Sequence, residues 1–186
     1  MGRIEFKNDS TRAIEETEGS DGRLNVSSRT DSRRYYNSRD QGNAYSFVYS
    51  FDSAASTEFA FYLKNTSTTK TLVVSSVGLN SAVAARLCLN FVTGTAADGT
   101  LVTPINANKT APYLASAIAM EGNTAATGIT GLTDVGKIDL AWVQATGHEE
   151  LRLDDTVRLG QNDAIALNVL ETAGGDVGGV VWFYYE

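Results

Sequence analysis

Hydrophobic and polar residues alternate with a period of two along most of the chain after Tyr45. In "FAFYLKN" the alternation places Phe59, Phe61 and Leu63 on one face of an extended segment. The same pattern recurs in "ARLCLNFV", "KIDLAWVQA" and "AIALNVL", and the terminal "GGVVWFYYE" is apolar on both faces. In the first three of these segments, the apolar residues that share one face are Leu87, Leu89 and Phe91, then Ile138, Leu140 and Trp142, then Ile165, Leu167 and Val169. Because this period is typical of half-buried strands, the pattern predicts a body built of β-strands.

Polar segments between these strands predict turns. "NTSTTK" separates "FAFYLKN" from "TLVVSSV", so residues 59–77 are expected to form a hairpin. The pair Asp98-Gly99 in "AADGT" predicts another turn. "TAGGDVGG", residues 172–179, predicts a flexible hairpin loop, because a phosphate-binding loop would be followed by a helix instead of a strand.

Helix signals are weak. "STRAIEETEGSDG" is consistent with one short helix that is capped by Ser10 or Thr11 and ends near Gly19. "APYLASAIAMEG", residues 111–122, is consistent with a helix or with a loop and a strand. Helical segments therefore do not alternate with strands, which disfavours a parallel α/β fold. The predicted fold class is all-β: an antiparallel β-sandwich, jelly-roll-like, with an extended N-terminal arm.

The chain divides into two regions of different composition, which we expect to be an extended arm (residues 1–43) and a β-sandwich domain (residues 44–186). The first 43 residues hold eight basic and eight acidic side chains and few apolar ones. The remainder holds the other seven basic and fourteen acidic groups of the chain, which accounts for the whole net charge of −7. So few apolar residues cannot close a core. The arm alone is therefore expected to be disordered or loosely extended, and to be ordered only where a partner holds it.

The most distinctive part of the arm is "RTDSRRYYNSRD", residues 29–40, just ahead of the first hydrophobic strand. Arginine and tyrosine are enriched at protein–protein contacts, because they bury area and form hydrogen bonds together. Stacking on single-stranded nucleic acid is an alternative, but Asp31 and Asp40 dilute the positive charge and the acidic body would repel a polyanion. A merely solvated tail is the other alternative. The candidate partner-binding residues are Arg29, Arg33, Arg34, Tyr35, Tyr36 and Arg39.

The sequence carries no constellation that predicts catalysis, a cofactor or a metal site. His148 is the sole histidine and lies in the polar segment "ATGHEELRLDD", where we expect a surface loop. The acidic pairs there have no EF-hand spacing, and one His with one distant Cys is a poor zinc site. Paired carboxylates for glycoside hydrolysis need only spatial proximity, so a chain with 22 acidic residues neither predicts nor excludes them. The protein is therefore expected not to be an enzyme.

Cysteine content and hydropathy set the expected compartment. Cys88 is the single cysteine and lies in an alternating apolar run, so we expect a buried side chain and no intrachain disulfide. No apolar run approaches the roughly 20 residues of a membrane helix, and the charged start "MGRIEFKNDS" is unlike a signal peptide. Synthesis in a reducing cytoplasm, without membrane attachment, is the expectation.

Two segments resemble small β-sandwich virion proteins of tailed bacteriophages. One is "FYLKNTSTTKTLVVSSVGL", and the other is "VRLGQNDAIALNVLETAGGDVGGVVWFYYE". The second segment, with its "Leu-Gly-x-x-Asp" turn, glycine-rich stretch and aromatic last strand, is similar to jelly-roll capsid decoration (cement) proteins. The resemblance covers the body from about residue 45 onward.

The resemblance implies a structural protein on the capsid exterior, made in the cytoplasm of the bacterial host. It implies a homo-oligomer, with a trimer favoured over a dimer, that bridges subunits of the major capsid protein through its sandwich and its arm. It implies no catalytic residues, and the residues and charge of the chain predict no cofactor and no nucleic-acid partner. Two alternative functions fit a similar sequence pattern. One is a phage tail, baseplate or fibre component, and the other is a carbohydrate-binding sandwich that exposes Trp142, Trp182, Tyr184 and Tyr185.

Overall fold

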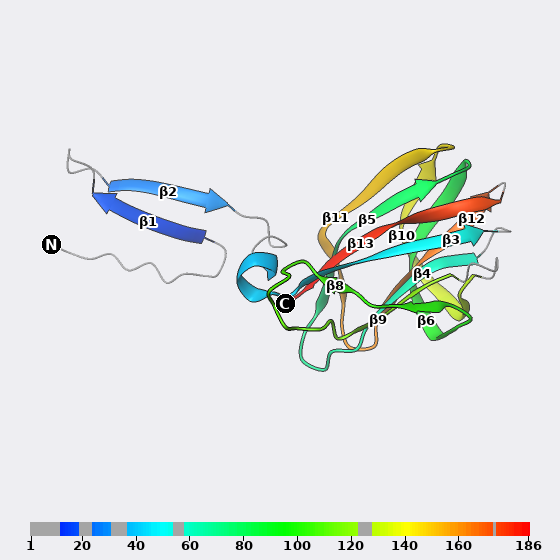
Figure 1. Cartoon of the computed structure of the whole chain (residues 1–186), viewed down its shortest axis with the longest axis horizontal. Helices are drawn as coiled ribbons and strands as arrows, with labels where there is room; N and C mark the ends of the chain where they lie inside the picture. Colours follow the sequence, from blue (N-terminus) through cyan, green and yellow to red (C-terminus); the bar gives the residue numbers. More distant parts are fainter. Residues whose placement is uncertain (1–11, 19–23, 31–36, 54–57, 123–127, 173) are drawn as a thin grey trace.

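Strands in three antiparallel sheets make up most of the computed structural model, which describes residues 12–18, 24–30, 37–53, 58–122, 128–172 and 174–186 (Figure 1). The smallest sheet pairs β1 (Arg12–Glu18) with β2 (Leu24–Thr30). The two larger sheets pack face to face around one hydrophobic core. The predicted class, an all-β antiparallel sandwich, is confirmed.

The two larger sheets are named here by their strand counts among the described residues. The five-stranded sheet contains, in spatial order, β11 (Gly147–Leu159), β5 (Leu72–Ser81), β13 (Gly175–Tyr185), β3 (Ala44–Ser53) and β8 (Ile105–Asn106). The six-stranded sheet contains β10 (Thr130–Val143), β6 (Ala85–Ala97), β12 (Ala164–Thr172), β4 (Glu58–Asn65), β9 (Ala117–Glu121) and β7 (Thr100–Val102).

The order of the long strands is that of a jelly roll. Between β3 and β6 each strand crosses to the opposite sheet, β6 and β10 are neighbours in one sheet, and from β10 to β13 each strand crosses again. The resulting orders, β11-β5-β13-β3 facing β10-β6-β12-β4, are the four-on-four arrangement of two Greek keys. The jelly-roll form of the sandwich is therefore confirmed.

An excursion between β6 and β10 widens both sheets on the same side. It begins at the predicted Asp98-Gly99 turn, where Asp98 has a positive φ of 62°. From there β7 and β9 extend the six-stranded sheet beyond β4, while β8 pairs with the start of β3 through Tyr45↔Asn106 and Ser46↔Ile105. The stretch 107–116, which begins with a turn, then passes over one end of the sandwich, where it forms a wall of the cavity described below.

A π-helical turn, η1 (Asn37–Gln41), leads into β3 at the same end. The amide of Asn43 donates to the carbonyl of Asn37 at 2.8 Å, and the amide of Tyr185 donates to the carbonyl of Asn43 at 3.0 Å. Residues just before β3 are thereby tied to the last strand. The predicted boundary between residues 43 and 44 coincides with the start of β3 and otherwise stays a prediction.

Strand β3 shows how the sequence pattern builds the core. In "AYSFVYSFDS" the aromatic residues Tyr45, Phe47, Tyr49 and Phe51 are buried and point into the sandwich, while the alternating polar positions point outward. Their rings meet those of the other strands: Phe47 and Phe61 lie edge to face at 5.9 Å, and Tyr49 and Phe61 lie 4.9 Å apart. Such contacts add to the burial energy of the rings.

The predicted hairpin over residues 59–77 is wrong. Its two halves became β4 and β5, which belong to different sheets, so the turn is an arch across the sandwich. Buried Asn65 holds the arch: its Nδ2 donates to the carbonyls of Lys70 and Leu159 at 2.9 Å, and its Oδ1 accepts from the amide of Ser67 at 2.9 Å. Alternation identifies a strand but not its partner, which explains the error.

The predicted hairpin around "TAGGDVGG" is wrong for the same reason, because β12 and β13 also lie in different sheets. Gly178 and Gly179 lie inside β13, not in a loop. A Cβ on Gly179 would stand 1.8 Å from the carbonyl oxygen of Gly78, so this glycine permits close packing of neighbouring backbones.

Three local predictions are also settled. The proposed helix after Ser10 is wrong: residues 12–18 form β1, which takes its hydrogen bonds from β2, whereas so short a helix is marginal by itself. In residues 111–122 the loop-and-strand alternative is confirmed, because Ala117–Glu121 is β9. The expected loop at His148 is wrong, since β11 begins at Gly147, although the imidazole is exposed as predicted.

Candidate binding surfaces

The predicted arm residues are only partly placed. Arg29 lies in β2 opposite Ala13, and Arg39 lies in η1, but the side chains of both fall outside the description. Arg33, Arg34, Tyr35 and Tyr36 lie outside the described residues. Their role as a partner-binding segment stays a prediction.

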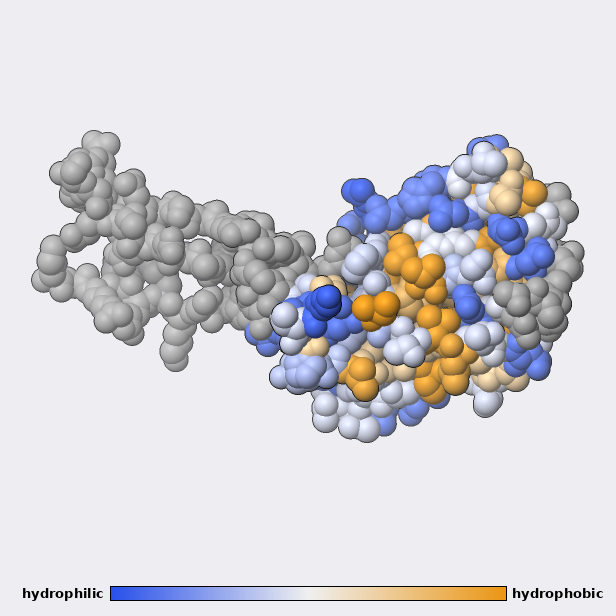
Figure 2. All heavy atoms as spheres, in the orientation of Figure 1, coloured by the Kyte–Doolittle hydropathy of each residue, from blue (hydrophilic) through white to orange (hydrophobic). Residues whose placement is uncertain are grey.

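The outer face of the five-stranded sheet carries an exposed apolar patch, the β3–β13 patch, made of Val48, Ile105, Val180 and Trp182. Register makes the four side chains neighbours: Val180 lies opposite Val48, Trp182 lies opposite Ser46, and Ser46 lies opposite Ile105 on its other side. Val48 and Ile105 are 67% and 72% exposed. Figure 2 shows apolar residues gathered on this face of the sandwich.

Beside the patch, two neighbouring positions of β5 hold small, buried residues. On β5, Ser76 lies opposite Trp182 and Gly78 lies opposite Val180. A Cβ on Gly78 would come within 3.2 Å of Val180 Cγ1, so any larger residue would lift or displace the valine. Farther out, on β11, the face becomes charged with the ion pair between Arg152 and Glu150. An apolar centre with a charged rim is typical of a protein contact.

The four aromatic residues that the sequence offers as a glycan-binding surface have different environments in the structure. Trp142 is 51% exposed on β10, beside exposed Leu140, and Trp182 is half-buried in the β3–β13 patch. Tyr184 and Tyr185 are buried. An exposed aromatic face therefore exists at Trp142, whereas the last two tyrosines are interior residues.

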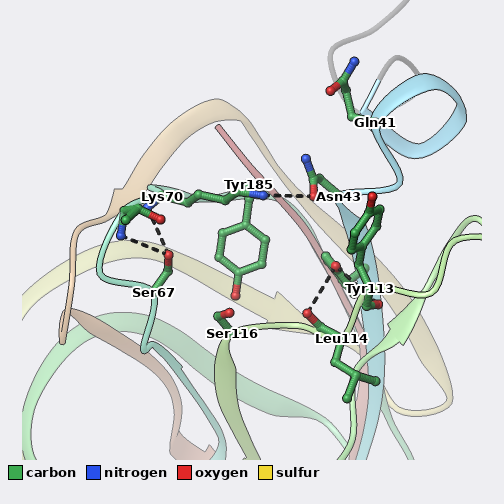
Figure 3. Close-up of a pocket in the computed structure, with 10 residues that line it drawn as sticks. Gln41, Asn43, Ser67, Lys70, Tyr113, Leu114, Ser116 and Tyr185 are labelled. Carbon is green, nitrogen blue, oxygen red and sulfur yellow. Dashed lines mark hydrogen bonds between the residues drawn. The ribbon is translucent and has the colours of Figure 1, made fainter.

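A cavity of about 440 Å³ lies at the end of the sandwich where η1, the β4–β5 arch and the stretch 107–116 meet (Figure 3). We call it the end cavity. Its lining comes from segments that are far apart in the sequence: Gln41, Asn43, Tyr45, Ser67, Thr69, Lys70, Tyr113, Leu114, Ser116 and Tyr185. No single motif could have revealed it.

Hydrogen bonds hold the walls of the end cavity in place. Asn106 Nδ2 donates to the carbonyl of Gly42 at 2.7 Å, which ties the long excursion to the start of β3. The amide of Thr66 donates to the carbonyl of Ser116 at 2.9 Å, which ties the arch to the other wall. Figure 3 shows Lys70 extending toward Asn43, whose Oδ1 accepts from Lys70 Nζ at 3.2 Å.

Two phenols lie at the floor of the end cavity. Tyr45 and Tyr185 meet edge to face at 5.8 Å. Burial raises the pKa of Tyr185, and its proximity to Tyr45 raises it further, while the backbone of Ser116 lowers it. Burial likewise raises the pKa of Tyr45, against a lowering by the side chain of Asn106. Both phenols therefore stay neutral at physiological pH.

The Tyr185 side chain is buried, and its hydroxyl makes no hydrogen bond of ordinary geometry with the described residues. Figure 3 shows the phenol pointing toward Ser116, whose backbone acts on it as a hydrogen-bond partner and lowers its pKa. Tyr49 gives the contrast, because its buried hydroxyl donates to the carbonyl of Gly78 at 3.0 Å.

A second cavity, of about 400 Å³, is lined by Ser81, His148 and Asp176 among others. These are the residue types of a catalytic triad, but the hydrogen bonds that a triad requires do not connect them. The imidazole Nδ1 donates to Asn80 Oδ1 at 2.7 Å, and Ser81 Oγ has no hydrogen-bond partner among the described residues. A relay requires a chain of contacts from serine through histidine to a carboxylate, and these contacts do not form it.

Several other features bear on chemistry. Cys88 is buried, as predicted, and burial raises its pKa, which favours the unreactive thiol. No group of three or more potential metal ligands occurs within the part of the chain that the structure describes. In that same part, no helix has the length and hydropathy to cross a membrane.

Comparisons with known proteins found no matching family model, no matching curated protein and no matching solved structure.

Proposed function

We propose that this protein is a structural virion component that decorates a phage capsid and stabilises it by bridging major capsid subunits. The observation that carries the proposal is the β3–β13 patch, an exposed apolar surface with a charged rim on a jelly roll. Contiguous apolar patches of this kind mark protein contacts. Because jelly rolls also serve as lectins, the capsid assignment rests on the resemblance of the two sequence segments to decoration proteins.

The two regions of the chain have different roles in this proposal. The β3–β13 patch binds a second copy of the chain and builds a homo-oligomer, with a trimer favoured. The arm binds the major capsid protein through Arg29, Arg33, Arg34, Tyr35, Tyr36 and Arg39. Several weak arm contacts carried by one oligomer gain strength through their high effective concentration.

The proposal needs no catalysis, cofactor, membrane or nucleic acid. The protein is made in the cytoplasm of the bacterial host and joins the exterior of the capsid there. Its acidic body, with fourteen acidic against seven basic residues, suits a surface outside the packaged DNA.

The test is co-sedimentation with expanded phage heads that lack the protein. The full chain is compared with a chain that starts at residue 44, and with an Arg33→Glu, Arg34→Glu variant. Full-length protein is expected to pellet with heads at saturating stoichiometry, whereas the truncation and the double variant stay in the supernatant. A matched control, Lys109→Glu with Lys137→Glu, reverses two exposed charges of the sandwich and is expected to pellet normally.

Three outcomes would count against this proposal. Equal pelleting of all forms would mean that the sandwich, not the arm, makes the capsid contact. Absence of the full chain from the head pellet would overturn decoration altogether. Copurification with tails, baseplates or fibres would then support the rival structural role.

A further inference from the structure

The outer face of the five-stranded sheet changes in character along β3 and β13. Three cross-strand pairs follow one another there: Val48 with Val180, Ser50 with Gly178, and Asp52 with Asp176. The first pair belongs to the β3–β13 patch, and the second lines the second cavity of about 400 Å³. The third, which we call the acidic pair, consists of two exposed carboxylates. Because four residues of a strand span about 13 Å, an apolar surface, a hollow and an acidic surface follow one another over that distance.

The acidic pair has no cationic partner among the described residues. The two arginines of the five-stranded sheet, Arg152 and Arg158, pair with Glu150 and Glu186 instead. The segments that directly follow β3 and precede β13, residues 54–57 and 173, contain no charged residue. Like charges that lie opposite each other on neighbouring strands destabilise a sheet, so the acidic pair favours a cationic group from outside the sheet.

One segment of the chain has the complementary composition. In "RRYY", residues 33–36, two adjacent arginines precede two adjacent tyrosines, an order that occurs once in the sequence. Four residues in an extended conformation span about 10 Å, which with the reach of an arginine side chain matches the spacing from the acidic pair to the β3–β13 patch. Arginine binds carboxylates bidentately, and tyrosine buries a large area on an apolar surface. The segment therefore fits this face in both charge and hydrophobicity.

Chain length excludes the arm of the same copy as the occupant. The amide of Asn43 bonds to the carbonyl of Asn37, so η1 lies at the start of β3. Asp52 lies nine residues farther along this strand, about 30 Å from Asn43. Arg34 is joined to Asn37 by three residues, at most about 11 Å of chain, and the length of its side chain does not cover the rest. The arm that reaches the acidic pair therefore comes from another copy.

We propose that residues 33–36 of one copy dock on the outer face of the five-stranded sheet of the next copy. The arginines bind the acidic pair beside the second cavity, and the tyrosines pack on the β3–β13 patch. Such a head-to-tail contact can close into a ring, as in a trimer. The inference rests on the self-association proposed above and names the part of the second copy that the patch binds. Because the same four residues are the proposed capsid contact, the docked arm is the state of the protein that is free of a capsid.

The test is light scattering of the full-length protein over a dilution series, with no capsid present. One variant, Asp52→Lys with Asp176→Lys, reverses the charge of the face. The other, Arg33→Glu with Arg34→Glu, reverses the charge of the arm. Each variant is expected to raise the dissociation constant of self-association at least about 30-fold, because like charges then oppose each other at the contact.

An equimolar mixture of the two variants tests whether the contact joins different copies. In the mixture a reversed arm can meet a reversed face, and an unaltered arm an unaltered face, only across two chains. The mixture is therefore expected to regain a mass above the 19.9 kDa of one chain. The matched control, Asp134→Lys with Asp139→Lys, makes the same charge change at exposed positions of β10 in the other sheet and is expected to keep the wild-type mass.

Several results would overturn the docking of the arm on this face. They are a mixture that stays at the mass of one chain, a loss of mass in only one of the two variants, and an equal loss in the control. An unchanged mass in both variants would overturn arm docking alone, because other residues of the second copy could still bind the patch. A monomeric wild type would overturn the self-association on which the inference rests. Since the samples contain no capsid, a failure of capsid decoration would leave all these results unchanged.

Discussion

The two faces of the five-stranded sheet carry similar residue types with opposite consequences. Phe47 and Val48 are adjacent in β3, yet Phe47 is 2% exposed and packs against Phe61, while Val48 is 67% exposed in the β3–β13 patch. The first side chain stabilises the sandwich, and the second is available to another molecule. The comparison teaches that apolar residues have different roles in this fold according to the face on which alternation places them.

Truncating Phe47 and Val48 in turn tests this difference between the inner and outer faces most sharply. Phe47→Ala is expected to cost about 3–5 kcal/mol of unfolding free energy, because it leaves a cavity in the core. Val48→Ala is expected to change the unfolding free energy of the isolated chain by less than about 0.5 kcal/mol. Urea unfolding under dilute conditions measures both. Similar losses for the two variants would contradict the assignment of the faces.

The stability of the protein at alkaline pH tests the burial of the tyrosine side chains on the inner face. Burial raises the pKa of Tyr49, and burial together with Tyr45 raises that of Tyr185, so the folded chain retains protons that the unfolded chain releases above about pH 10. Stability is therefore fully present below about pH 10 and falls above it, by about 1.4 kcal/mol per pH unit for each such phenol. Urea unfolding at stepped alkaline pH measures the slope, which Tyr49→Phe is expected to reduce. A flat profile would contradict the burial of these phenols.

A smaller difference separates two phenols within the inner face. Tyr49→Phe is expected to cost about 1 kcal/mol at neutral pH, because it leaves the carbonyl of Gly78 without its hydrogen bond. Tyr185→Phe is expected to cost less than about 0.5 kcal/mol, since its hydroxyl makes no hydrogen bond of ordinary geometry and loses only its contact with the Ser116 backbone. Thermal unfolding of both variants compares them directly. A larger loss for Tyr185→Phe would mean that its hydroxyl is satisfied within the protein.

Alternation predicted the strands and the sandwich class because one face of each strand must be buried. It could not predict pairing: "FAFYLKN" and "TLVVSSV" look like hairpin partners, but buried Asn65 turns the chain into the opposite sheet. The outward position of Val48 could have been deduced from its alternation with Phe47 and Tyr49. The end cavity could not, because Asn43, Lys70 and Tyr185 meet only in the folded chain.

The measurement that tests the contact surface most directly is the molar mass in solution, by light scattering, of the wild type and a Val48→Glu variant. The wild type is expected to have a multiple of the 19.9 kDa chain mass. Val48→Glu is expected to have the mass of one chain with an unchanged far-UV spectrum, because a buried unpaired carboxylate would oppose association. Val135→Glu, which alters an exposed valine of the other sheet, is the matched control and is expected to keep the wild-type mass. A monomeric wild type, or a Val48→Glu variant that stays multimeric, would contradict self-association through the β3–β13 patch.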